Sequence, residues 1–531
     1  MTVPAKPPRP KPAGRHSGRS DASRQEPGAR QSGQSGHSGK PADAHRSAQS
    51  RPSRSRRVRS DPARRVALDV LRAVSDRDAY ANLLLPSLLT ERGIAGRDAA
   101  FATELTYGTL RRRGTYDAIL AVCSDRDRMD PAVRDVLRLG AHQLLSTRTG
   151  SHAAVSTSVD LAKDVCGPRP SGFVNAVLRR VASRDLDAWL AIVAPDRAAD
   201  EVGYLSVRYS YPRWIVEAFR DALADSAIPA ETEQALAAGN ARPEVVLALL
   251  PSSETDLDSA ELALASRRGA ERTRWSPFGL RLTGGGDPAP LIATGQAAAQ
   301  DEASQLIAIA LSRAPLDGPD NLWLDLCAGP GGKARLLHHL ATVRGARLVA
   351  SEVRPHRAVQ VRDALRPAAA GVPGQFSGAA GGPGQFSAAA GVVIADGRHG
   401  PWRPGTFDRV LADVPCSGLG SLRRRPEARW RKTPSDLSEL ADLQRQLLTS
   451  AIESVRPGGV VAYVTCSPHQ AETHDVVTAV VGARSDITVL DAPAILAEVP
   501  DLPTPRDKRF AQFWPHRHTT DAMFLALLRR D

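Results

Sequence analysis

Cysteine is scarce in this sequence. Five cysteines occur among 531 residues, and their spacing fits neither a disulfide framework nor a zinc site. We therefore expect a reducing, cytoplasmic setting and no metal ion. Long apolar runs are also missing, and none approaches the roughly twenty residues that a membrane-spanning helix needs. Because the first residues lack the apolar segment of a signal peptide, we expect neither a membrane protein nor a secreted one.

Acidic residues are depleted in one region, the first sixty residues. Residues 1–60 contain 14 lysines or arginines against three acidic residues, whereas the rest of the chain has 56 against 55. This tail is rich in Pro, Gly, Ser and Arg and has few apolar side chains to bury, which predicts disorder. Two interpretations stay open: a solvated tail without a specific role, or an arm that binds a polyanion such as RNA.

Helical periodicity dominates residues 61–188. The stretch "DPARRVALDVLRAV" begins with Asp61 and Pro62, a typical N-cap and first helical residue. No strand-like alternation interrupts the helical stretches that follow, which predicts an all-helical domain. Residues 189–290 give a mixed pattern, which we interpret as a linker and a small α/β subdomain. In it, "ARPEVVLALLP" and "FGLRLTG" are the expected strands.

Strands and helices alternate over residues 291–531. This pattern predicts a doubly wound, Rossmann-like α/β domain, so that the chain as a whole is multidomain. Between the second and third expected strands, "GVPGQFSGAA" and "GGPGQFSAAA" form a tandem repeat at 371–390, which we interpret as a flexible surface loop. The expected strands are 322–326, 347–351, 392–395, 409–412 and 460–465.

The stretch "LWLDLCAGPGGKARLL" is typical of a strand, a glycine turn and a helix whose free N–H groups suit a ligand. Its glycine spacing does not match the G-x-G-x-x-G of dinucleotide folds. It does not match a P-loop either, because Ala334 follows Lys333 where a P-loop has Ser or Thr. Glu352 ends the next strand, where a carboxylate can accept hydrogen bonds from both ribose hydroxyls. Asp396 follows the third strand, over the same crevice or as a helix cap. A phosphate-free adenosine cofactor, S-adenosylmethionine, fits this combination.

Two cysteines and an aspartate follow later strands: Asp413 and Cys416 in "LADVPCSGLG", and Cys466 in "AYVTCSPHQ". Beside a methyl donor, they suit methylation of cytosine at C5. That reaction needs a thiolate that adds to C6, a group that hydrogen-bonds N3 and a base that removes the C5 proton. The three side chains can fill these roles. The alternative, that both cysteines are small buried apolar residues, suits a lone cysteine better than this pair.

The segments "LDLCAGPGGKA", "ADGR", "LADVPCSGLGSLRRRPEARW" and "AYVTCS" resemble the motifs of RNA cytosine-C5 methyltransferases of the NOL/NOP/Sun family. The stretches "FATELTYGTLR" and "FVNAVLRRV" resemble the NusB-like domain of the bacterial small-subunit rRNA enzymes of that family. This resemblance covers 61–531. It implies an enzyme that forms 5-methylcytosine in 16S rRNA, with RNA bound by the NusB-like domain and by the subdomain at 189–290, although the helical domain could instead be a protein-docking module. We expect a monomer.

By the same resemblance, Cys466 is the nucleophile and Cys416 assists release of the product. Two cofactor residues depart from the family, which usually has Ala at the position of Gly329 and Asp at that of Glu352. Of a family Pro-Glu-Glu-Asn after the nucleophile, only Glu472 is matched, and "DAMF" at 521–524 replaces Asp-Gly-Phe-Phe. The implied cofactor contacts are Cys327, Ala328, Gly329, Pro330, Gly331, Gly332, Lys333, Glu352, Asp396 and Asp413.

A cytosine must leave its stack to reach two cysteines, so we expect a single-stranded or loop nucleotide as the target. In "SLRRRPEARWRK", Arg423, Arg424 and Arg425 are expected to meet phosphates, and Trp430 to stack or to brace the loop. A solvated basic helix is the alternative.

Other functions stay open at this point. A methyltransferase acting on tRNA or 23S rRNA would share these motifs. A non-catalytic RNA-binding or antitermination factor is disfavoured by the intact cysteine pair. A small-molecule methyltransferase leaves the basic tail and the helical domain unexplained.

Overall fold

The computed structural model describes residues 60–124, 128–224, 231–250, 269–283, 288, 292, 295–366 and 390–531. The predicted basic tail, except its last residue, and the predicted flexible repeat, except Ala390, therefore lie outside the described residues. Among the residues that are described, no helix is long and apolar enough to cross a membrane.

Every element described between Pro62 and Ala238 is a helix, which confirms the all-helical prediction for the first part of this region. The first helix begins as expected, because the Asp61 side chain accepts a hydrogen bond from the Arg64 N–H and Pro62 occupies the first turn. The helices are α1 (Pro62–Arg77), α2 (Ala81–Glu91), α3 (Gly96–Arg111), α4 (Arg113–Cys123), α5 (Pro131–Ser146), α6 (Ser151–Cys166), α7 (Ser171–Val181), α8 (Leu186–Val193), α9 (Glu201–Tyr209), α10 (Arg213–Leu223) and α11 (Glu231–Ala238).

An antiparallel sheet of four strands follows these helices. Its strands are β1 (Val245–Leu249), β2 (Ala270–Arg272), β3 (Gly279–Leu282) and β4 (Ala297–Ala299), in the spatial order β2–β3–β1–β4. Strands β1 and β3 coincide with the two that the sequence predicts. Strand β4 lies beyond residue 290 yet pairs with β1. Three successive alanines carry no apolar–polar alternation, so the sequence gives no signal for this strand.

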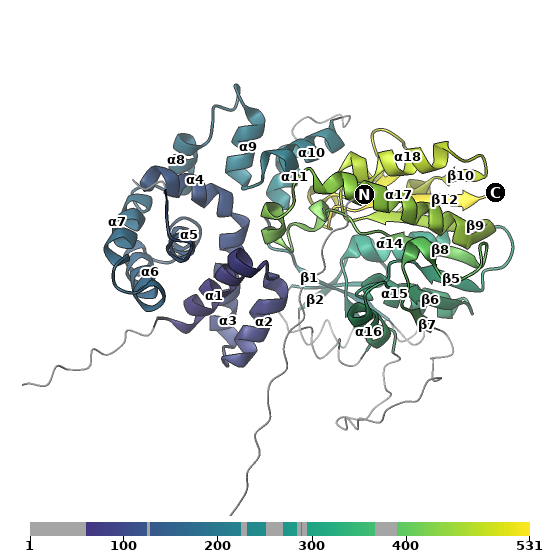
Figure 1. The fold of residues 1–531 in the computed structure, drawn as a ribbon, viewed down its shortest axis with the longest axis horizontal. Helices are drawn as coiled ribbons and strands as arrows, with labels where there is room; N and C mark the ends of the chain where they lie inside the picture. Colours follow the sequence, from purple (N-terminus) through teal and green to yellow (C-terminus); the bar gives the residue numbers. More distant parts are fainter. Residues whose placement is uncertain are drawn as a thin grey trace, which may run out of the picture. The chain divides into compact units, whose positions relative to one another are not determined.

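The main sheet confirms the predicted doubly wound domain. Its order is β10–β12–β9–β8–β5–β6–β7, with β11 paired to β12 (Figure 1). Strands β5 to β9 run parallel, and β10, β11 and β12 pair antiparallel. The strand order reverses between β5 and β8, and ligands bind at such a point, beyond the carboxyl ends of the strands. The strands are β5 (Leu322–Asp325), β6 (Arg347–Ser351), β7 (Ala390–Val393), β8 (Phe407–Asp413), β9 (Val455–Thr465), β10 (Ile487–Leu490), β11 (Ala511–Gln512) and β12 (Phe524–Arg530).

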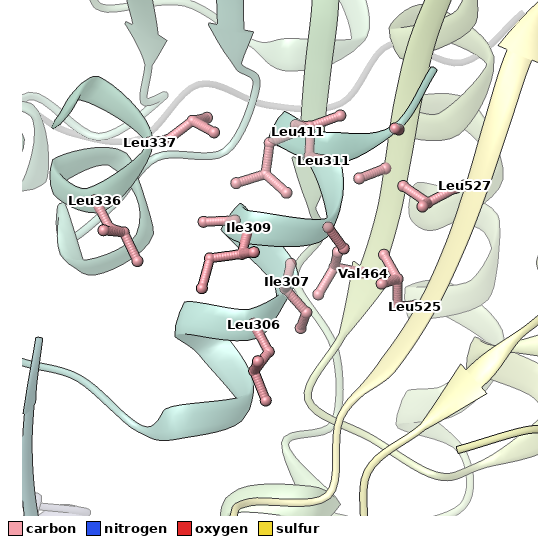
Figure 2. Close-up of a cluster of buried hydrophobic side chains, with 14 of the residues drawn as sticks. Leu306, Ile307, Ile309, Leu311, Leu336, Leu337, Leu411, Val464, Leu525 and Leu527 are labelled. Carbon is pink, nitrogen blue, oxygen red and sulfur yellow. The ribbon is translucent and has the colours of Figure 1, made fainter. Parts of the chain in front are cut away.

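Helices cover both faces of this sheet. On one face, the apolar side of α14 packs against Leu411, Val464 and Leu525 of three different strands (Figure 2). On the other face, α17 and α18 cover Leu324 and Val410. Burial on both faces fixes the strand ends that carry the site. The remaining elements are α14 (Glu302–Arg313), α15 (Gly332–Val343), α16 (Pro355–Ala364), α17 (Asp436–Ser454), α18 (His474–Gly482), α19 (Ala492–Ile495), α20 (Pro515–His518) and the 3₁₀ turns η1 (Gly397–His399), η2 (Leu419–Ser421), η3 (Pro426–Trp430) and η4 (Gln470–Glu472).

Candidate active site

The glycine loop, residues 327–333, joins β5 to α15 at the edge where the strand order reverses. Gly331 caps α15 with a φ of 112°, which residues with side chains rarely adopt. At Gly332, a Cβ would meet no atom within 4 Å, so the first turn of α15 is open to a ligand. The loop borders a cavity of about 770 Å³. The cavity lining includes Asp325, Cys327, Ala328, Gly329, Pro330, Gly332, Lys333 and Asp413.

Glu352 reaches this loop from the end of β6. Its carboxylate accepts a hydrogen bond of 2.9 Å from the Arg354 backbone N–H, and the residue is only 5% exposed. A Cβ at Gly329 would overlap Oε2 of Glu352. The glycine thus supplies the room that the longer carboxylate needs, and the two departures noted in the sequence are linked.

Asp396 has a partner of its own beside it. Like Glu352 and Gly331 it is absent from the cavity lining, and it accepts a hydrogen bond of 3.0 Å from the Arg398 N–H at the start of η1. Its carboxylate also pairs with the Arg398 guanidinium at 2.6 Å, which lowers the pKa of Asp396 to about 2. This geometry matches the helix-cap alternative, and a contact of Asp396 with the cofactor stays a prediction.

Asp325, at the end of β5, is a buried carboxyl group in the cavity wall. It is 1% exposed, and neither carboxylate oxygen has a hydrogen-bond partner in the part of the chain that the structure describes. Burial, followed by the negative charge of Asp413, raises the pKa of Asp325 to about 8. An unpaired buried carboxylate is costly and is a common mark of a ligand site.

These residues fit S-adenosylmethionine. Glu352 offers ribose acceptors, Asp325 can face a positively charged group of the cofactor, and the glycine loop leaves its backbone accessible. The described residues contain no cluster of three His, Cys, Asp or Glu side chains that could hold a metal ion.

Lys333 and Asp413 form an ion pair at the cavity wall. The Lys333 ammonium donates a hydrogen bond of 2.9 Å to the Asp413 carboxylate. Burial disfavours the charged ammonium, but Asp413 outweighs burial and the pKa of Lys333 is raised. A fixed positive charge therefore lies next to the carboxylate that ends β8.

The two cysteines lie together, as the sequence predicts. The sulfur of Cys416, after β8, is 3.2 Å from the sulfur of Cys466, after β9. A hydrogen bond from the Cys416 thiol lowers the pKa of Cys466, and the Lys333 charge acts in the same direction against burial and Asp413. The same bond, with burial, raises the pKa of Cys416 well above its ordinary value. The thiolate is therefore favoured at Cys466, the form that a nucleophile needs.

Glu472 holds the loop that carries Cys416. Fully buried, it accepts hydrogen bonds from the Ser417 N–H at 2.7 Å, from the Ser417 hydroxyl and from the Gln444 amide at 3.2 Å. In the sequence, Glu472 is the one matched residue of the family's Pro-Glu-Glu-Asn, and nothing in the sequence indicates that it holds the Cys416 loop. Its acceptors fix the direction of the Pro-Cys-Ser loop.

The "DAMF" segment also supports the cysteine loops. The Gly420 N–H donates to the Cys466 carbonyl at 2.9 Å, and the Ala522 N–H donates to the Gly420 carbonyl at 3.0 Å. A Cβ at Gly420 would overlap the Ala522 carbonyl. The turn therefore joins the two cysteine loops even though its sequence differs from the family pattern.

The arginine segment, residues 423–431, excludes one of the expected alternatives. Arg423, only 8% exposed, pairs with Asp301 at 2.6 Å and with Asp521. Arg424 pairs with the same two aspartates, at 2.7 and 3.0 Å. These ion pairs exclude the alternative of a solvated basic helix, and phosphate contacts by Arg423 and Arg424, which also line the cavity, stay a prediction. Arg425 is the exposed member of the three.

The same segment ties the catalytic domain to the preceding helices. Arg429 is fully buried, and its guanidinium lies 3.7 Å from the centre of the Tyr211 ring. Trp430 braces the loop, because its ring packs so closely against Gly114 that a Cβ there would lie 2.6 Å away. The acceptors around Arg429 are the carbonyls of Arg111 (2.9 Å), Ser210 (3.2 Å) and Gly239 (3.0 Å) and the Tyr211 hydroxyl (2.9 Å).

Two family models match this chain. A model described as 16S rRNA methyltransferase RsmB/F matches residues 385–529, and the NusB family model matches residues 61–183. Both agree with the resemblance stated from the motifs.

Relatives of similar length extend these matches. The Rv1407 protein of Mycobacterium tuberculosis, whose name assigns it provisionally to the methyltransferases, is 49% identical over 481 residues, covering 90% of this chain and 98% of the relative. The ribosomal RNA small subunit methyltransferase B of Pseudomonas syringae pv. tomato is 30% identical over 435 residues, covering 81% and 88%. The crystal structure of PH0851 shares the fold, with a TM-score of 0.68 at 21% identity over 88% of this chain and 98% of that one.

Proposed function

The chain belongs to the RsmB/F family of S-adenosylmethionine-dependent methyltransferases, and on this premise we propose that it forms 5-methylcytosine in 16S rRNA, acting as a single chain. The observation that carries the proposal is the sulfur–sulfur distance of 3.2 Å between Cys416 and Cys466. Cytosine-C5 chemistry needs a thiolate and a second group beside it when that thiolate leaves.

The first step is addition of the Cys466 thiolate to C6 of the cytosine. A bond forms between sulfur and C6, and the electron pair of the C5–C6 double bond makes C5 nucleophilic while negative charge develops towards N3. Asp413 lies beside N3 in this proposal, and the Lys333 ammonium that donates to its carboxylate supplies the proton that Asp413 relays to N3. When bound, S-adenosylmethionine supplies an electrophilic methyl group for C5.

The second step is release of the product. The C5 proton passes to water, the electron pair restores the C5–C6 double bond, the Cys466–C6 bond breaks, and the N3 proton returns through Asp413 to Lys333. Cys416 assists here because its thiol, held by the Glu472-fixed loop, can donate a hydrogen bond to the Cys466 sulfur as that sulfur leaves as thiolate.

Two features support rRNA as the substrate. The helical region matches a NusB model, and the Pseudomonas relative is named for the small ribosomal subunit. The cavity walls that hold the glycine loop and Asp413 also include side chains of α2 and α3, so the helical region borders the site. We propose that this region helps to bind RNA.

The test is methyl transfer to defined RNAs. Purified protein and labelled S-adenosylmethionine are incubated separately with 16S rRNA, 23S rRNA and tRNA, and the product is mapped by bisulfite sequencing. We expect label at a cytosine of 16S rRNA. Methylation confined to tRNA or 23S rRNA would refute the 16S assignment. Cofactor and RNA binding without methyl transfer to any of the three would favour the non-catalytic RNA-binding alternative.

A further inference from the structure

The start of α2 carries an exposed aromatic ring two residues before Asn82, which lines the cavity. Tyr80 is 48% exposed, and it is the one aromatic residue among the exposed large apolar side chains of the described residues. Aromatic side chains are normally buried, so an exposed ring close in sequence to a cavity residue needs a reason.

Two guanidinium groups lie close to this ring. Arg431 lies 5.0 Å from the ring centre and is fixed by a hydrogen bond of 2.6 Å to the Ala79 carbonyl. Arg425, the exposed residue among the three arginines at 423–425, lies 5.9 Å from the ring centre. Unlike Arg423 and Arg424, Arg425 forms no ion pair with a carboxylate of the described residues. We call Tyr80, Arg425 and Arg431 the Tyr80 platform.

The platform continues into the active-site cavity. Arg425 lines that cavity together with Lys333 and Asp413, and so does Asn82, two residues after Tyr80. The Asn82 side-chain oxygen is buried without a hydrogen-bond partner among the residues described. Polar groups of this kind are available to a ligand that enters the cavity along α2.

Arginines on the same wall suit a polyanion. Arg111, Arg242 and Arg425 all line the cavity. Of the acidic residues of that wall, Glu244 is paired with Arg281 at 3.4 Å, and Glu104 lies 3.6 Å from His142, whose pKa is lowered by burial. Arginine beside an exposed aromatic ring is the combination that binds single-stranded nucleic acid, where bases stack on the ring and guanidinium groups contact phosphates.

We propose that the Tyr80 platform holds the RNA strand next to the target cytosine, with a neighbouring base stacked on Tyr80 and a phosphate bound by Arg425. This inference rests on the proposed function. It explains how the strand is retained once the target base has left its stack, since the neighbouring base gains a new stacking surface. A protein partner would require an apolar patch, whereas an exposed ring with arginines close to it suits an RNA strand.

The experiment measures steady-state methyl transfer to protein-free 16S rRNA. Tyr80→Ala should raise the KM for RNA about ten-fold, with kcat and the KM for S-adenosylmethionine little changed. Tyr80→Phe retains the ring and should behave as the wild type. Arg425→Gln should raise the KM and reduce the slope of log affinity against log salt by about one. The matched control is Arg220→Gln, which alters an exposed arginine on α10.

The same variants are assayed for equilibrium binding of 16S rRNA, so that the two proposals fail separately. If the wild type binds RNA without transferring a methyl group, the proposed function fails, and the binding data still test the platform. Unchanged RNA affinity and KM in both Tyr80→Ala and Arg425→Gln would overturn the platform and favour a brace or a protein-docking site. A ten-fold loss in Tyr80→Ala that Tyr80→Phe restores would support it.

Discussion

The glycine loop and the arginine segment border the same cavity but are held in opposite ways. Around the glycine loop, the Gly332 backbone is open and the Asp325 carboxylate is unpaired within the described residues. In the arginine segment, Arg423 and Arg429 are surrounded by carboxylates and carbonyls of the chain itself. The loop is thus shaped for a ligand, whereas most of the segment is shaped to hold the protein together.

This difference separates two kinds of charge beside an active site. A buried charge whose partners come from the chain positions the backbone, and its removal leaves those partners uncompensated. A charge or backbone group without an internal partner is available to cofactor or substrate. Arg425 shows that one segment can contain both kinds, because it is exposed beside the paired Arg423 and Arg424.

The largest effects are expected at the two cysteines, because they act on the substrate directly. Cys466→Ala removes the C6 nucleophile, so neither a covalent RNA species nor methyl transfer should be detected. Cys416→Ala should still allow attack but slow the release step, and a protein–RNA adduct should accumulate on denaturing electrophoresis. An adduct in Cys466→Ala instead would reverse the two roles, and full activity in both variants would make the cysteines packing residues.

The next largest effect concerns the buried charges that are paired within the chain and position the backbone. Arg423→Ala leaves Asp301 and Asp521 buried with Arg424 as their remaining cation, and should cost about 3 kcal/mol of stability. Arg425→Ala, two residues away but exposed, should change stability by less than about 0.5 kcal/mol. Urea unfolding followed by tryptophan fluorescence measures both. Equal unfolding midpoints for the two variants would contradict the distinction between the buried, paired Arg423 and the exposed Arg425.

A smaller effect concerns the link between Gly329 and Glu352. Gly329→Ala should push the Glu352 carboxylate aside and weaken S-adenosylmethionine binding about ten-fold, because a ribose acceptor is misplaced. In that variant, Glu352→Asp should recover affinity, since the shorter side chain leaves room for the added methyl group. Calorimetry on the single and double variants measures the coupling. Strictly additive losses would show that the two positions act independently.

These contrasts also show which features a sequence can reveal. Strands β5 to β9, the glycine loop and the cysteine pair were predictable because their signals are local: apolar runs, glycine spacing and residues just beyond strand ends. The neighbourhood of Cys416 and Cys466 followed from parallel strands that end at one edge.

Features that depend on distant partners were not predictable. Arg423 looks basic in isolation, and the aspartates that neutralise it lie about a hundred residues away on either side, at Asp301 and Asp521. Glu472 and the Gly329–Glu352 contact likewise depend on three-dimensional approach. Asp396 sits just past a strand, as a cofactor ligand would, but its nearest cation is two residues away in the sequence, and that local pair dominates.

The remaining prediction is a pH dependence from Asp325, the buried carboxyl group at the start of the glycine-loop region. Its pKa is raised from an ordinary 3.8 to about 8 in the folded chain, so between these values the native state holds a proton that the unfolded chain has lost. Stability from this group is complete below about pH 4 and is lost as the pH rises towards about 8. Asp325→Asn keeps the shape without the ionisation, so its melting temperature relative to the wild type should rise across this window and level off above it. Bound S-adenosylmethionine should narrow the difference, because a cationic group near Asp325 favours the carboxylate. Parallel melting curves for the two proteins at all pH values would show that Asp325 is already compensated within the chain, and the glycine loop would then resemble the arginine segment.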